Sequence, residues 1–239
     1  MSRQLRWMAI LMVALTGAGC ATDPLKIAQH IIPGQIKTIA LAPVGVPPDL
    51  GHPEPVMAKF ESLLEAKLRE GGFSIVPSRE FVEIWKRMAE QVGGYFDPVT
   101  GKREEAKFRA VQEHALRELS ATFKADALVQ ARIQPVTVPF RATEATWHGT
   151  SQLVEGGWQR FGTIGALSLV ITIVDSHGVV MYTNAGGIQL LAEFKGNQLV
   201  LVPRHELFTD EERNAAAVNI ALGPLVKQSG PTVAPREKR

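Results

Sequence analysis

The sequence predicts an α/β fold in which a mixed β-sheet is flanked by helices, and three observations predict it. Strand-like and helix-like periods alternate along the first half of the chain, as they do in βαβ units. Residues 166–174 are apolar at almost every position, which is typical of a strand covered on both faces. The turn sequence 175–178 then leads into the strand-like run 179–184, which predicts a hairpin.

The first half begins with the β-branched run 36–43, a predicted strand that Pro43 closes. A helix should follow and end at Gly71, because apolar residues recur at helical spacing before that glycine. Its stripe consists of Met57, Phe60, Leu64 and Leu68. Residues 73–77 predict a second short strand. The next helix should take Ser78 as its N-cap, and a third should begin near Glu104.

The second half predicts mainly strands. Apolar and polar residues alternate over 128–134, a half-buried strand that Pro135 and Pro139 should limit. Residues 140–163 are rich in glycine, threonine and charge and receive no assignment. Further strand-like runs cover 188–194 and 198–202.

A last helix should open on a capping box of Thr209 and Glu212, and Gly223 with Pro224 should stop it. The polar, proline-containing residues after it predict a loose tail.

The chain begins with the pattern of an export signal. Basic residues Arg3 and Arg6 precede an apolar run, Trp7 to Leu15, that is too short to span a membrane comfortably. Small residues then lead to Cys20. We therefore expect four segments: a signal peptide over 1–19, a lipidated cysteine and tether over 20–35, an α/β globular domain over 36–225, and a flexible tail over 226–239.

The string LTGAGC, Leu15 to Cys20, resembles the lipobox of bacterial lipoproteins. That resemblance implies cleavage by signal peptidase II before a cysteine that carries diacylglycerol and palmitate. Ala18 and Gly19 fit the pattern, whereas Gly17 stands where an apolar branched residue is usual. The alternatives are ordinary cleavage nearby and an incidental cysteine.

Composition excludes several classes of function. Cys20 is the single cysteine, so the chain can form no intramolecular disulfide. Processing removes two of the 26 basic residues and leaves 24 against 24 acidic ones, a balance that indicates no nucleic-acid partner. The six histidines show no metal-ligand spacing, and no phosphate-binding glycine motif occurs. We therefore predict no metal and no cofactor.

Three stretches resemble a group of envelope lipoproteins: IKTIALAPV, LEAKLREGGFSIVPSREF, and FKADALVQARI with LSLVITIVDSHGVVMYTN. The group contains the curli-secretion lipoprotein family, the penicillin-binding-protein activator lipoproteins and the amino-terminal domain of TolB. The resemblance implies a mixed sheet flanked by helices and a role in binding or assembly. Pore-forming relatives place a membrane-inserting segment where this chain has 140–163, which lacks the alternation of transmembrane strands.

Asp175, Ser176 and His177 are the three residue types of a catalytic triad. They are consecutive on a turn, however, and a triad needs groups that converge from separate elements. Trp147, Trp158 and Phe161 lie in the unassigned stretch beside glycines and are the candidates for a partner contact. The alternative is that these rings cover the edge of the core.

The sequence thus predicts a noncatalytic periplasmic lipoprotein, anchored by lipid, that binds or helps assemble an envelope protein partner. A subunit of an oligomeric secretion or transport pore is the first alternative, and a periplasmic hydrolase is the second. Ala21 after the modified cysteine favours the outer membrane over the inner membrane, by analogy with enterobacterial sorting.

Replacing Cys20 by Ala should abolish lipid labelling and release the protein from membranes. The variant lacks the thiol that carries the predicted lipid, and the acyl chains are what hold such a protein on the membrane. Metabolic labelling with radioactive palmitate, followed by membrane fractionation, measures both effects. Unchanged labelling of the variant would contradict the anchor.

Overall fold

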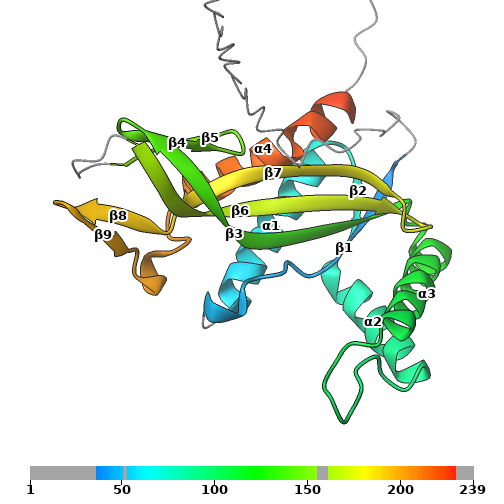
Figure 1. Ribbon diagram of the computed structural model, residues 1–239. Coiled ribbons are helices and arrows are strands. Elements are labelled where there is room, and N and C mark those ends of the chain that lie inside the picture. The colour runs from blue at the N-terminus through cyan, green and yellow to red at the C-terminus, as the bar shows by residue number, and fades with distance from the viewer. Residues whose placement is uncertain (1–35, 51–52, 155–160, 230–239) are drawn as a thin grey trace, which may run out of the picture.

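The computed structural model describes residues 36–50, 53–154 and 161–229. They form a seven-stranded mixed sheet with helices on both faces and a separate two-stranded hairpin (Figure 1). This arrangement confirms the predicted α/β class. The predicted signal peptide, Cys20, Trp158 and the end of the predicted tail lie outside the described residues.

The strands are β1 (Thr38–Leu41), β2 (Ser74–Val76), β3 (Ala127–Arg141), β4 (Glu144–Trp147), β5 (Thr150–Leu153), β6 (Phe161–Asp175), β7 (Val180–Leu190), β8 (Ala192–Lys195) and β9 (Gln198–Leu201). The α-helices are α1 (Pro53–Glu70), α2 (Ser78–Gln91), α3 (Glu105–Phe123) and α4 (Glu211–Ser229). Short 3₁₀ turns cover Pro48–Leu50 and Arg204–Glu206. None of the helices in these described parts of the chain is long and apolar enough to cross a membrane.

The sheet is built around one long antiparallel pair. β3 and β6 pair along their whole length, from Ala127 opposite Asp175 to Arg141 opposite Phe161, a span of about 45 Å. β1 and β2 add to β3 in parallel, and β7 adds to β6 antiparallel. β6 is therefore central, as its apolar sequence predicts.

Side chains alternate between two differently covered faces. On one face, a large core gathers under α1 and α4, and it includes Leu64, Ala217 and Ile171. On the other face, α2 and α3 cover one end of the sheet, where Ile84 and Leu119 belong to a second cluster. A third cluster lies at the far end of that same face.

The β4–β5 hairpin covers the third cluster. Its Trp147 is 6% exposed, and the indole Nε1 donates to the Leu167 carbonyl of β6 at 3.4 Å. Two adjacent glycines of β7 allow the hairpin and α4 to pack closely against this strand. A Cβ on Gly187 would lie 2.7 Å from the Trp147 Nε1, and one on Gly186 would lie 2.0 Å from the Ala217 carbonyl oxygen of α4. β7 is thus contacted closely on both faces.

The predicted end of a strand at Pro135 and Pro139 is wrong, because β3 runs through both. Odd-numbered residues of β3 direct their backbone groups away from β6, since Val129 and Ala131 accept bonds from the β1 segment and Ile133 donates to it. The missing N–H groups of both prolines therefore face an edge beyond the reach of β1, where a ladder bond is not required.

The predicted stop at Pro224 is also wrong, because α4 continues to Ser229. A proline inside a helix leaves the carbonyl four residues before it without a donor. Here that carbonyl belongs to Ile220, and the Asn184 Nδ2 of β7 donates to it at 3.1 Å. The Tyr182 hydroxyl donates to the next carbonyl, that of Ala221. Burial raises the pKa of this tyrosine above its ordinary value of 10.0.

Two predicted helix caps are replaced. Ser78 lies inside α2 and its hydroxyl donates to the Glu61 Oε2 at 2.6 Å instead of capping. At the start of α4, the Asp210 Oδ1 accepts the Arg213 N–H at 3.0 Å, so Asp210 caps this helix, whereas the Thr209 hydroxyl donates to the Glu206 carbonyl.

Asn184→Ala should lower the free energy of unfolding by about 1–3 kcal/mol, because it leaves the Ile220 carbonyl without a donor. In a Pro224→Ala background the loss should be smaller, since that second substitution restores a helical N–H to the same carbonyl. Urea unfolding of the four proteins in this cycle measures the coupling. Asn219→Ala, on the exposed side of α4, is the matched control. Equal losses in both backgrounds would contradict the account.

Candidate functional site

A groove lies between the β4–β5 hairpin, the end of β7 and the start of α4. Its volume is about 980 Å³. The wall on one side is β5 with its flanking residues, and the opposite wall is residues 187–190 of β7. The turn before α4 and the first turns of that helix close one end of the groove.

Side chains of β5 join the two walls, beside one backbone bond in which the Gly187 N–H donates to the His148 carbonyl at 3.2 Å. The Gln152 Nε2 donates to the Ile188 carbonyl at 3.0 Å, and the Gln152 Oε1 accepts the Leu190 N–H at 3.0 Å. The Thr150 hydroxyl donates to the Gly187 carbonyl at 2.8 Å. The side-chain amide of Gln152 thus occupies the place of a peptide group of a neighbouring strand, which protects this part of the β7 edge.

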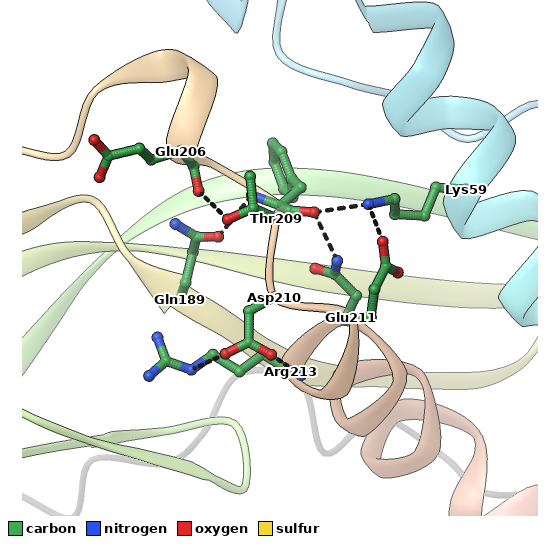
Figure 2. A network of polar contacts seen from close by, with 9 residues as sticks. Lys59, Gln189, Glu206, Thr209, Asp210, Glu211 and Arg213 are labelled. Atoms are coloured by element: carbon green, nitrogen blue, oxygen red, sulfur yellow. Dashed lines mark hydrogen bonds and ion pairs between the residues drawn. The ribbon is translucent and has the colours of Figure 1, made fainter.

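A buried turn closes the groove beside α4. Phe208 is 4% exposed and has a positive φ of 61°, a conformation that is uncommon for a bulky residue. Figure 2 shows Gln189 reaching this turn from the sheet and Lys59 reaching it from α1. The Gln189 Oε1 accepts the Phe208 N–H at 2.8 Å, while the Lys59 Nζ donates to the Phe208 carbonyl at 2.8 Å. Asn214, which is fully buried, donates to the same carbonyl at 2.9 Å.

The charges at the start of α4 neutralise one another locally. The Arg213 Nε lies 3.0 Å from the Asp210 Oδ2, and the Lys59 Nζ lies 2.6 Å from the Glu211 Oε1. Both pairs are drawn in Figure 2. Asp210 and Glu211 therefore each already have a cationic partner.

The turn after β6 has the geometry of a turn and not of a catalytic triad. The Asp175 Oδ1 accepts the N–H groups of His177 and Val179, both at 2.8 Å. The Ser176 hydroxyl and the Asp175 Oδ2 both approach the Nδ1 of His177, at 3.4 and 3.8 Å. A triad needs the serine and the carboxylate on different ring nitrogens. Among the described residues, no three His, Cys, Asp or Glu side chains are grouped to hold a metal ion.

The aromatic residues of the predicted contact occupy different environments. Trp147 is buried in the third cluster, whereas Phe161 at the start of β6 is 79% exposed. Trp158 lies outside the described residues, and Trp147 and Phe161 do not share one exposed surface. Sequence reasoning missed Gln152 and Arg213, because a single glutamine or arginine carries no pattern until the fold places its partner.

Comparisons with known proteins add a distant likeness. No protein-family model matches the chain, and no curated protein sequence does. Among solved structures, the chain is similar to a PelC variant dodecamer from Paraburkholderia phytofirmans, with 9% sequence identity and a TM-score of 0.38. The match covers 82% of this chain and 93% of that one. A likeness at this level does not assign the chain to a family.

Gln152→Leu should lower the free energy of unfolding by about 1–3 kcal/mol, because the Ile188 carbonyl and the Leu190 N–H both lose their partner. The N–H of Leu190 should also exchange with solvent faster. Hydrogen exchange followed by NMR and urea unfolding measure the two effects. Gln91→Leu, at the exposed end of α2, is the control. Unchanged protection of Leu190 would show that Gln152 does not seal this edge.

Proposed function

We propose that the chain is a noncatalytic, lipid-anchored periplasmic protein that binds or helps assemble another component of the cell envelope. The observation that supports this proposal most directly is an apolar arm, the β8–β9 hairpin, at one end of the sheet (Figure 1). In this proposal the lipid is attached to Cys20, as the lipobox resemblance implies, and it anchors the protein to the periplasmic side of the outer membrane, as Ala21 favours.

The inner side chains of the arm pack against the third cluster. Phe194 of β8 packs edge-to-face on Phe140, with ring centroids 6.1 Å apart, and Ala192 is buried. Leu199 and Leu201 lie opposite these two residues on β9, yet they are 51% and 75% exposed. The third cluster thus extends into an apolar surface that no described residue covers.

A two-stranded hairpin alone is only marginally stable in water, and its unpaired backbone edges can pair with another chain. Soluble proteins keep such surfaces for contacts with partners. An arm of this kind suits a binding or assembly protein, which needs an exposed contact surface.

The alternative, a subunit of an oligomeric secretion or transport pore, is favoured by further exposed apolar side chains in two other places. Phe96 and Val99 are exposed on the α2–α3 loop, and Val179 and Val180 are exposed at the β6–β7 turn. The loop is ordered by Asp97, whose pKa is lowered because the backbone N–H groups of Thr100 and Val99 donate to its carboxylate. The β6–β7 turn lies at the other end of the β3–β6 pair from the arm.

Two different apolar regions at opposite ends of a molecule suit head-to-tail contacts between copies, whereas a two-fold dimer requires one self-complementary surface. The two proposals therefore differ in which ends they need. A single envelope partner held by the arm requires the β8–β9 end alone, and self-assembly requires both ends.

The test is the native mass of the lipidated protein purified gently in detergent from its own membranes, with every co-purifying chain identified. Replacing Leu199 and Leu201 together by Ser should abolish co-purification of a partner chain, or the oligomer if the chain forms one. The melting temperature should change little, because both side chains are exposed. The companion variant Val179→Ser should disrupt an oligomer and leave a single-partner complex intact. An unchanged complex in the arm variant would overturn both proposals.

A further inference from the structure

On the sheet face opposite α1 and α4, the middle of β3 carries polar side chains. α2 and α3 cover one end of this face and the β4–β5 hairpin covers the other (Figure 1). The residues of β3 between the two covers are Gln130, Arg132 and Gln134, which lie on the same side of the strand because side chains alternate. We call these three residues the polar strip.

An aromatic cavity of about 500 Å³ opens beside the polar strip. Phe81, Trp85 and Phe108 form its apolar wall, and Gln130 of the strip lines it together with Gln112 and Lys86. Cavities of this size, mostly apolar with a few polar groups, are typical of small-molecule sites. The Trp85 Nε1 donates to the Tyr95 hydroxyl at 3.2 Å, so part of this wall is held in place.

The charges around the cavity complement an anion. Arg132 follows Gln130 by two residues on the same face, about 7 Å further along the strand, and it is exposed. In the described residues its guanidinium forms no ion pair and no hydrogen bond. Lys86, the charged residue of the cavity lining, has one long contact of 3.5 Å with the exposed Glu83. A solvated sheet face would explain the polar strip alone, but not an aromatic cavity beside an unpaired arginine.

We propose that this cavity binds a small amphipathic carboxylate with a single apolar chain. The chain lies against Trp85 and Phe108, and the carboxylate pairs with the guanidinium of Arg132, which presents two parallel donors to such a group. The amides of Gln112 and Gln130 supply further polar contacts at the mouth. This site lies outside the β8–β9 arm, so it stands or falls separately from the proposed function.

Isothermal titration of the full chain carrying Cys20→Ser, which takes no lipid, tests the site with decanoate and decan-1-ol as probes. Arg132→Gln should weaken decanoate binding about tenfold, as expected for loss of a charge-assisted hydrogen bond, and should leave decan-1-ol binding unchanged. Phe108→Ala should weaken both probes. Arg141→Gln, an exposed arginine on the same strand but on the other face, should change neither.

Three outcomes would overturn the proposal. The first is that decanoate does not bind. The second is equal decanoate affinity in the parent chain and in Arg132→Gln. The third is binding of phosphatidylglycerol vesicles that depends on Arg132 while decanoate does not bind, which would assign the site to a membrane surface.

Discussion

The register of the β3–β6 pair determines where every other element can pack. Because side chains alternate along a strand, a shift of one residue would exchange every side chain of β3 between the two faces. The observed register places Val129, Ala131 and Ile133 in the core under α1 and α4. The same register puts Leu128 in the second cluster and Val138 in the third, with the polar strip between them. The two strands extend beyond the helices, so the far end needs a cover of its own.

Side chains satisfy backbone groups wherever the regular ladder fails. Asn184 and Tyr182 supply the donors that the helix lacks around Pro224. Gln152 takes the place of a strand beside β7, and Gln189 with Lys59 fixes the positive-φ turn at Phe208. A buried carbonyl or N–H without a partner costs about 1–3 kcal/mol. Because of these polar side chains, the fold tolerates a proline inside α4, the β4–β5 hairpin beside β7 and the positive-φ turn at Phe208.

The proposed binding functions use separate parts of the molecule. The β8–β9 arm is an apolar surface at one end of the sheet, whereas the aromatic cavity lies beside the polar strip, toward α2 and α3. Both consist of contact residues and not of reactive groups. The ion pairs of the large groove join residues that already neutralise each other, such as Asp210 and Arg213. A partner bound at the β8–β9 arm would therefore leave the aromatic cavity open to a ligand.

Local sequence was enough to predict the α/β class, the central strand around Ile171 and the amphipathic helices, because periodicity and apolar runs are properties of neighbouring residues. It also indicated that Gln130, Arg132 and Gln134 share a face. The passage of β3 through Pro135 and of α4 through Pro224 became evident only in the folded molecule, since each proline depends on what lies beside its missing N–H. The same reason separates Trp147 from Phe161: exposure depends on which distant segment covers a ring, and local sequence does not contain that segment.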